Sequence, residues 1–218
     1  MTSQRCPVIV LAGGKSTRFG RDKASSVIDG TTLLQRAVDA VAGIATSIVI
    51  VKAGGQHLPE TRSTAPMSTV EDVYANAGPL GGIYTGLLAL TASRQPRAPV
   101  EPLPALVVAC DMPLLQPALL RELLRLVAGH QAAVPVRDGL PEPLCAVYTT
   151  ACAEPARRLL EGHDYKLAGL LGHVDTLLVP EEGWRALDPE GLSFLNVNRE
   201  TDLERAKALI ARGEGANG

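Results

Sequence analysis

This sequence of 218 residues has few aromatic residues and no large excess of charge of either sign. Aromatic residues make up 3% of it, and 21 lysines and arginines face 23 aspartates and glutamates, which leaves a net charge of −2. Proteins that bind nucleic acids carry a basic excess, and single-strand binders stack bases on aromatic side chains. We therefore expect no nucleic-acid partner.

Long apolar runs are missing as well. No stretch approaches the ~20 apolar residues that a membrane-spanning helix needs. The apolar run near the N-terminus, 7–12, is short and leads into glycine, lysine and arginine, which is not typical of a signal peptide. We expect a cytoplasmic protein that does not interact with membranes.

The cysteines and histidines lack the spacing of a metal site. Cys6, Cys110, Cys145 and Cys152 form no C-x-x-C pair, and the four histidines fall at no useful interval. Structural zinc sites need such spacing, and disulfides are rare in the cytosol. We expect reduced, mostly buried thiols and no zinc.

Apolar runs rich in valine, isoleucine and leucine alternate with segments of helical spacing, and 46% of the residues are hydrophobic. This alternation favours an α/β three-layer sandwich, a mostly parallel sheet with helices on both faces. No linker divides the chain, so we predict one domain, 1–212, and a frayed tail, 213–218. The expected strands are 7–12, 47–53, 105–111, 132–136, 144–149 and 174–180, and the expected helices are 32–43, 78–92, 117–129, 151–162 and 200–213.

The segment after the first expected strand, LAGGKSTRFGRDKA (11–24), is glycine-rich and basic. It holds two lysines and two arginines against one acid, Asp22. Glycines let the backbone approach a ligand and aim N–H groups at it, and the basic side chains suit a polyanion such as a nucleoside triphosphate. A P-loop would need an earlier glycine where Ile9 stands, so that motif is excluded.

An aspartate follows a buried strand in ALVVACDMPLL (105–115). In open parallel sheets ligands bind at the carboxyl ends of the strands, so Asp111 is expected to point into that cleft. Mg²⁺ prefers hard oxygen ligands and is often held by one or two carboxylates together with substrate phosphates. Asp111 fits that role; the alternative is that it caps the next helix.

Two asparagines stand before the last expected helix, in FLNVNRETDL (194–203). Asn196 and Asn198 are two residues apart and share a face if the segment is extended. Either offers an amide oxygen to a metal or a polar contact to a phosphate. The alternative is that Asn198 caps the helix.

Several segments of the sequence resemble those of a known protein family. The run from Leu11 to Lys23 is similar to the signature of nucleotidyltransferases of the molybdenum cofactor guanylyltransferase type, with Phe19 where methionine is commoner. The segments ACDMP (109–113) and TVEDVYANAGPLGGI (69–83) also resemble family segments and follow in the right order. The resemblance implies a Rossmann-like fold of the nucleotide-diphospho-sugar transferase type.

The resemblance also implies roles for individual residues. Arg18, Lys23 and Asp111 would be catalytic, and Asp111 and Asn198 would bind Mg²⁺. Lys52 stands where the family often has an asparagine that touches the nucleotide. The implied nucleotide-binding residues are Leu11, Ala12, Gly13, Gly14, Lys23, Lys52, Asp72, Gly78, Pro79, Leu80 and Asp111.

The implied reaction is transfer of GMP from GTP to the phosphate of molybdopterin, with release of pyrophosphate. Molybdenum insertion or acceptor proteins are expected partners by resemblance alone. A cytidylyltransferase acting on molybdopterin, a sugar-phosphate nucleotidyltransferase and a non-catalytic nucleotide-binding module stay open as alternatives. Cytidylyl relatives tend to have alanine where Gly13 stands, and we interpret this glycine as leaving room for a purine.

Overall fold

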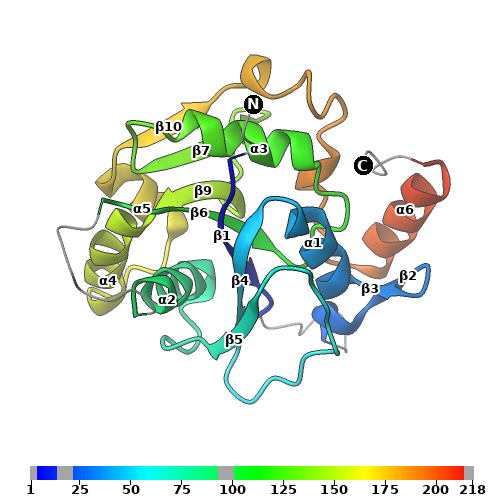
Figure 1. Ribbon diagram of the computed structural model, residues 1–218, viewed down its shortest axis with the longest axis horizontal. Coiled ribbons are helices and arrows are strands. Elements are labelled where there is room, and N and C mark those ends of the chain that lie inside the picture. Colours follow the sequence, from blue (N-terminus) through cyan, green and yellow to red (C-terminus); the bar gives the residue numbers. More distant parts are fainter. Residues whose placement is uncertain (1–3, 14–21, 93–100, 214–218) are drawn as a thin grey trace.

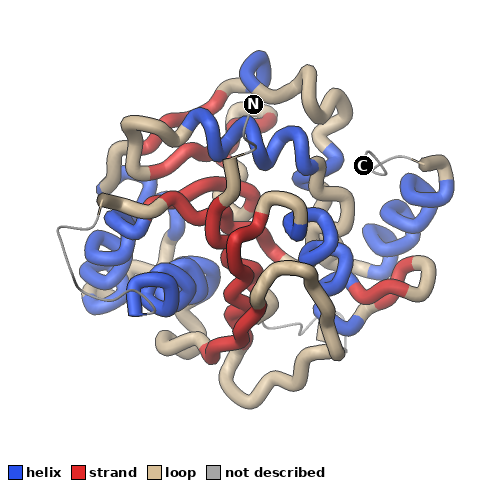
Figure 2. The backbone as a smooth tube through the Cα atoms, viewed as in Figure 1, coloured by secondary structure: helices blue, strands red, loops and turns tan. Residues whose placement is uncertain are grey.

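A computed structural model describes residues 4–13, 22–92 and 101–213. Its centre is an eight-stranded sheet in which seven strands follow the order β10-β7-β9-β6-β1-β4-β5, and β8 pairs with β7 (Figures 1 and 2). The strands are β1 (Cys6–Leu11), β4 (Ala45–Lys52), β5 (Met67–Glu71), β6 (Pro104–Ala109), β7 (Ala132–Arg137), β8 (Leu140–Pro141), β9 (Cys145–Thr149) and β10 (Thr176–Val179).

The sheet is mostly parallel, as the sequence predicts. β5, β4, β1 and β6 run in one direction, and so does the pair β7 and β10. β9 lies between β6 and β7 and is antiparallel to both. Because two reversals restore the direction, β6 and β7 end at the same edge of the sheet.

Helices cover both faces of this sheet and give three layers. α1 (Leu33–Ala42) and α3 (Pro117–Leu126) pack on one face, and α2 (Gly78–Ala92), α4 (Ala153–Glu161) and α5 (Leu167–His173) pack on the other (Figure 1). α6 (Glu200–Ala211) lies to one side, against a small ribbon of β2 (Val27–Ile28) and β3 (Thr31–Thr32). The expected three-layer α/β fold is therefore confirmed.

Local sequence explains the helices on each face. α1 begins after Thr32, whose hydroxyl accepts a hydrogen bond from the Gln35 N–H at 3.2 Å, and its buried face carries leucine, valine and alanine at helical spacing. α2 is apolar on most sides and packs closely on the sheet, because Gly86 lies against Ile9.

We predict that Gly86→Ala destabilises the fold. A Cβ at this position would come within 2.5 Å of the Ile9 side chain, in a part of the core where Ile9 is fully buried. Overpacking a core costs about 1–3 kcal/mol. The free energy of unfolding should fall by this amount, and the urea concentration at the midpoint of unfolding should fall with it. Gly172→Ala, which has open space around its Cβ, serves as the control; equal midpoints for the two variants would contradict the prediction.

Several elements differ from the expectation. The edge strand β5, the ribbon β2–β3, the short strand β8 and helix α5 were not expected as such. The helix expected at 151–162 begins as a 3-10 turn, Thr150–Cys152, before α4. The single-domain assignment stays a prediction, and residues 214–218 of the predicted tail lie outside the described residues.

All four cysteines are buried and free, as expected. Within residues 4–13, 22–92 and 101–213, no helix has the length and apolar character needed to cross a membrane.

Candidate active site

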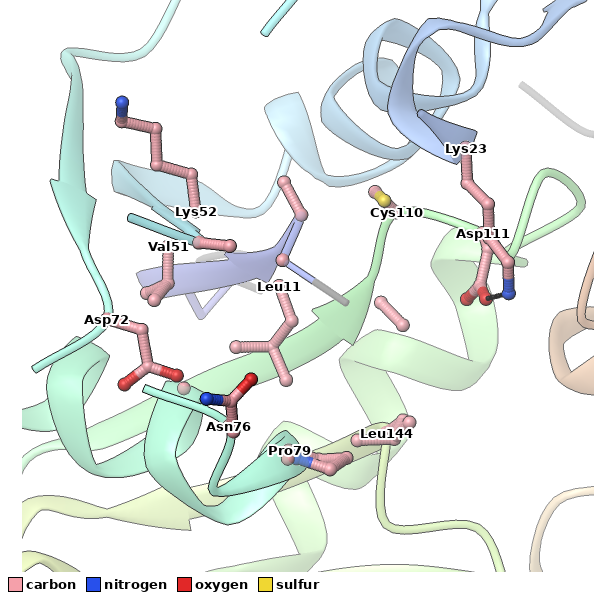
Figure 3. A pocket seen from close by; sticks show the side chains of 16 residues that line it. Leu11, Lys23, Val51, Lys52, Asp72, Asn76, Pro79, Cys110, Asp111 and Leu144 are labelled. Atoms are coloured by element: carbon pink, nitrogen blue, oxygen red, sulfur yellow. Dashed lines mark hydrogen bonds and ion pairs between the residues drawn. The ribbon is translucent and has the colours of Figure 1, made fainter. Parts of the chain in front are cut away.

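A cavity of about 510 Å³ opens where β1, β4 and β6 end, next to the first turn of α2 (Figure 3). Its position follows from the topology, because the parallel strands β4, β1 and β6 are neighbours and their carboxyl ends meet. The cavity is lined by Leu11, Ala12, Gly13, Lys23, Val51, Lys52, Ala53, Asp72, Asn76, Gly78, Pro79, Gly82, Ala109, Cys110, Asp111 and Leu144.

Most of the candidate site residues named from the sequence lie on this cavity. Three do not line it: Leu80 is fully buried in the core beneath it, Asn196 lines a different cavity, and Asn198 lies beyond Lys23. Gly14 and Arg18 lie outside the described residues. The residues brought together are Leu11, Ala12, Gly13, Lys23, Lys52, Asp72, Gly78, Pro79 and Asp111.

Lys23 joins the two oxygen donors that the sequence singled out. Its ammonium donates to Asp111 Oδ2 at 3.1 Å and to Asn198 Oδ1 at 2.6 Å. The three residues come from distant parts of the chain, and the side chains of Lys23 and Asp111 are 23% and 17% exposed. Both oxygens are therefore within reach of a single cation at the mouth of the cavity.

The capping interpretations of the two oxygen donors do not match this geometry. The residue that precedes α3 is Gln116, five residues beyond Asp111. α6 is capped by Arg199 and Asp202, and the backbone N–H of Asn198, not its side chain, bonds to Asp202. The side chains of Asp111 and Asn198 are thus directed to Lys23.

Asn198 is held in place by the backbone next to Asp111. The N–H of Val197 donates to the Asp111 carbonyl at 2.8 Å. This bond fixes the last loop of the chain against the end of β6, which explains how an asparagine 87 positions further along the sequence reaches the same lysine.

Gly13 is required by close packing of the chain against the end of β4. A Cβ on Gly13 would lie 2.9 Å from the Ala53 nitrogen, closer than real Cβ contacts. The chain leaves β1 against the end of β4, with the Gly13 N–H bonded to the Val51 carbonyl at 3.2 Å. Our sequence interpretation, that this glycine leaves room for a purine, stays a prediction.

Gln56 links the two flanks of the glycine-rich segment. Its side-chain amide donates to the Ala12 carbonyl at 3.0 Å and to Asp22 Oδ2 at 2.8 Å, while its oxygen accepts from the Ala53 N–H at 2.9 Å. Ala12 and Asp22 stand on either side of residues 14–21. No sequence signal marks this residue, because a lone glutamine in a polar loop is ordinary.

We predict that Gln56→Ala raises the KM for the nucleotide about tenfold and changes kcat less. The variant loses two bonds that hold the flanks of the segment, each worth ~1 kcal/mol, and this loss falls mainly on nucleotide binding. Steady-state kinetics measure it. Gln35 also makes side-chain hydrogen bonds, but to Asp39 and Arg62, away from the cavity. Gln35→Ala is therefore the matched control, and equal KM values in both variants would contradict the role of Gln56.

The opposite end of the cavity carries Lys52 and Asp72 (Figure 3). The Lys52 ammonium pairs with Glu71 at 2.9 Å on the neighbouring strand β5, and this bond lowers the pKa of Glu71. Asp72 Oδ1 accepts from the Tyr74 N–H at 3.0 Å and from the Thr85 hydroxyl at 2.9 Å. The Asp72 carboxylate is thus oriented by these two neighbours.

Cys110 lines the cavity but is not a nucleophile. Burial, followed by the negative charge of the adjacent Asp111, raises the pKa of its thiol far above the usual range. The thiol therefore stays protonated at neutral pH, and the thiolate is the reactive form of cysteine.

The oxygens of Asp111 and Asn198 fit a hard divalent cation that takes its remaining ligands from water and substrate. A carboxylate and an amide oxygen are both bonded by one ammonium, and Mg²⁺ commonly takes one or two protein oxygens and completes its shell with water and phosphate. Among the described residues, no three histidine, cysteine, aspartate or glutamate side chains gather as a metal cluster, so a cage made by the protein alone is not present there.

Comparison with known proteins places the chain among nucleotidyltransferases. Residues 8–177 match the model of the family described as the MobA-like NTP transferase domain. The molybdenum cofactor guanylyltransferase of Desulfosudis oleivorans is 32% identical over 207 residues, which are 94% of this chain and 96% of that protein.

Solved structures show the same fold. The crystal structure of molybdopterin-guanine dinucleotide biosynthesis protein A from Archaeoglobus fulgidus superposes with a TM-score of 0.74 and 25% identity, and covers 94% of this chain and 99% of its own. The 2-C-methyl-D-erythritol 4-phosphate cytidylyltransferase from Thermus thermophilus is 20% identical, with a TM-score of 0.63 and coverage of 94% and 98%. At that identity the second likeness concerns the fold alone.

Proposed function

Since the chain belongs to the family of MobA-like NTP transferases, we propose that it transfers GMP from GTP to the phosphate of molybdopterin. The products are molybdopterin guanine dinucleotide and pyrophosphate. The observation that carries the proposal is the contact of the Lys23 ammonium with both Asp111 and Asn198 at the mouth of the large cavity. The guanylyltransferase relative and the molybdopterin-guanine dinucleotide protein support the choice of substrates.

One end of the cavity suits the triphosphate of a nucleotide, and the other end suits its base and ribose. The triphosphate would lie along Ala12 and Gly13, near Lys23, and the base and ribose would lie toward Asp72 and Pro79 (Figure 3). The oriented carboxylate of Asp72 can accept hydrogen bonds from a guanine amine or a ribose hydroxyl.

The reaction is a displacement at the α-phosphorus of GTP. An oxygen of the acceptor phosphate forms the new bond to this phosphorus, and the bond to the bridging oxygen of pyrophosphate breaks. Attacking group and substrate are both anions, so the protein contributes positioning and neutralisation of charge rather than covalent catalysis. A phosphate monoester has its second pKa near 6, so it is largely deprotonated at neutral pH and needs little help from a base.

Asp111 and Asn198 are the residues that would hold Mg²⁺. When bound there, the ion would polarise phosphoryl oxygens and stabilise developing negative charge. Lys23 donates to the same two oxygens in the structure; on nucleotide binding its ammonium is released to the triphosphate, where it neutralises the leaving pyrophosphate. Arg18 is proposed to assist Lys23, by family resemblance.

A cytoplasmic location is supported by the four free, buried cysteines, since reduced thiols are usual in that compartment. Handing the product to a molybdenum insertion or acceptor protein stays a prediction that rests on resemblance alone.

The proposed function is tested by supplying the protein with Mg²⁺, molybdopterin and, in separate reactions, labelled GTP, CTP or ATP. We expect the guanine dinucleotide, identified by mass, and pyrophosphate release only with GTP. A cytidine product would identify a cytidylyltransferase instead. Nucleotide binding without any product would favour the non-catalytic alternative and contradict the proposal.

A further inference from the structure

The described residues enclose a second cavity, of about 340 Å³, at the same edge of the sheet as the first. It lies at the end of β7 and is walled by the segment that precedes α6 and by α6 itself. Its polar side chains come from Arg137, Asp138, Arg185, Glu190, Asn196 and Arg205. Nothing in the proposed nucleotide site uses these residues.

This second cavity lies next to Asp111. Arg137 is the last residue of β7, which ends at the same edge as β6, and only β9 separates these two strands. Two strand spacings amount to about 10 Å. The chain also connects the two places directly, because Asn196 lines the second cavity, Val197 bonds to the Asp111 carbonyl and Asn198 bonds to Lys23.

In the walls of the second cavity, two guanidinium groups lie over the buried rings of Phe194 and Trp184. The Arg137 guanidinium lies 5.9 Å from the centroid of the Phe194 ring, and the Arg185 guanidinium lies 5.2 Å from that of Trp184. The Trp184 ring is itself fixed, since its Nε1 donates to the Val136 carbonyl at 3.0 Å. Planar guanidinium groups are pre-organised donors, so these walls suit a flat, polar ligand.

The charges in this cavity leave donors available to a ligand. Arg137 is engaged with Asp138 at 3.3 Å, and Arg185 pairs with Glu181. The structure gives Arg205, on α6, no ion pair with any described residue. The Arg185 guanidinium is already engaged on all three nitrogens, by Glu181 and by the Pro189 carbonyl. Arg137, Arg205 and Asn196 can donate to ring carbonyls and ring nitrogens, while Asp138 and Glu190 can accept from an amino group.

We propose that this second cavity binds the ring system of the acceptor, a pterin whose phosphate reaches Asp111. The inference rests on the proposed function, and it assigns a site to the second substrate. Displacement at phosphorus needs the attacking and leaving groups roughly in line. With GTP in the first cavity, an acceptor that enters from the β7 side approaches from a direction different from that of the nucleotide. A pterin offers the amino, carbonyl and ring-nitrogen groups that these side chains complement.

Trp184 provides the readout, because it is the only tryptophan of the chain and lines the second cavity. Pterins absorb where tryptophan emits, so binding quenches its fluorescence. The probe is 6-hydroxymethylpterin monophosphate, a pterin phosphomonoester, titrated into the full-length protein. We expect saturable quenching in the wild type, an apparent Kd at least ~10 times higher in Arg205→Ala, as expected for the loss of a charge-assisted hydrogen bond, and partial recovery in Arg205→Lys.

Two controls make this test specific to the second cavity. Arg212, at the far end of the same helix and outside the cavity, should be replaceable by alanine without effect on the Kd. Addition of GTP without Mg²⁺ should leave the Kd of the pterin unchanged, because the two ligands occupy different cavities. Competition by GTP, an unchanged Kd in Arg205→Ala, or no binding to the wild type would each overturn the inference.

The same experiments separate this inference from the proposed function. If Arg205→Ala keeps the wild-type KM for molybdopterin while guanine dinucleotide is still made, the acceptor site is elsewhere and the function stands. If the pterin binds in an Arg205-dependent way but no guanylyl transfer occurs, the acceptor site stands and the proposed function is wrong.

Discussion

Asp111→Asn is expected to lower kcat for guanylyl transfer by at least ~10²–10³-fold, the loss that follows removal of one well-placed electrostatic group from an active site. The substitution keeps the size of the side chain and one oxygen, but it removes the negative charge that the Lys23 ammonium contacts at 3.1 Å. An amide is a much weaker ligand for Mg²⁺ than a carboxylate. Asp111→Ala is expected to lose at least as much.

The fold should survive this change, so the loss can be assigned to chemistry. Asp111 is partly exposed, and its backbone carbonyl, which bonds to Val197, is untouched by the substitution. Circular dichroism and the melting temperature of the variant check this point. Asp39→Asn changes an exposed aspartate on α1 and serves as the matched control with wild-type kcat. Near-normal turnover in Asp111→Asn would contradict the assignment of this residue.

Lys23→Met is expected to have opposite effects on turnover and on metal binding. Turnover should fall at least ~10²-fold, because the variant lacks the cation that we place on the triphosphate. Binding of Mn²⁺ in the absence of nucleotide should become about tenfold tighter, a gain of ~1.4 kcal/mol. The reason is competition: the ammonium bonds to Asp111 and Asn198, the same two oxygens that the metal needs.

Electron paramagnetic resonance of Mn²⁺ measures this affinity without any need for activity. Lys52→Met is the matched control, because Lys52 pairs with Glu71 and does not contact Asp111, and its Mn²⁺ affinity should equal that of the wild type. Two results would contradict the role given to Lys23: turnover close to the wild-type value, or Mn²⁺ binding no tighter than in the wild type.

The sequence predicts the edge of the sheet at which the first cavity opens, for a physical reason. Buried parallel strands are continuous apolar runs, so the ends of β1 and β6 are visible in the sequence at Ala12 and Asp111. Because parallel strands end at one edge, residues that follow them meet. A cavity shared by Asp111 and the segment that follows β1 is therefore foreseeable, whereas the contact between Lys23 and Asp111 is not.

Other features of the fold could not be predicted from the sequence. β9 is buried on both faces, and its sequence does not reveal that it runs antiparallel to β6. β5 is an edge strand with mostly exposed residues, so no apolar run in the sequence predicts it. A helix was expected to begin at 151, but a 3-10 turn precedes α4. The sequence did not predict this turn because the spacing of apolar residues over one turn does not distinguish the two helix types.

The residues that support the site were also beyond prediction from the sequence. Gln56 reaches Ala12 and Asp22 across the fold, and no local pattern encodes contacts at that separation. The same holds for Arg137, Arg185 and Arg205, which meet around the second cavity only after β7 and α6 have been placed. Spacing in the sequence reveals neighbours on one element, not neighbours across elements.

A crystal structure of the protein with GTP and Mg²⁺ tests the central claim most directly. The account predicts the triphosphate beside Gly13 and Lys23, the base toward Asp72 and Pro79, and the ion bound to the oxygens of Asp111 and Asn198, from which the Lys23 ammonium has moved away. Nucleotide bound outside the cavity of about 510 Å³, or an ion held without Asp111, would contradict it.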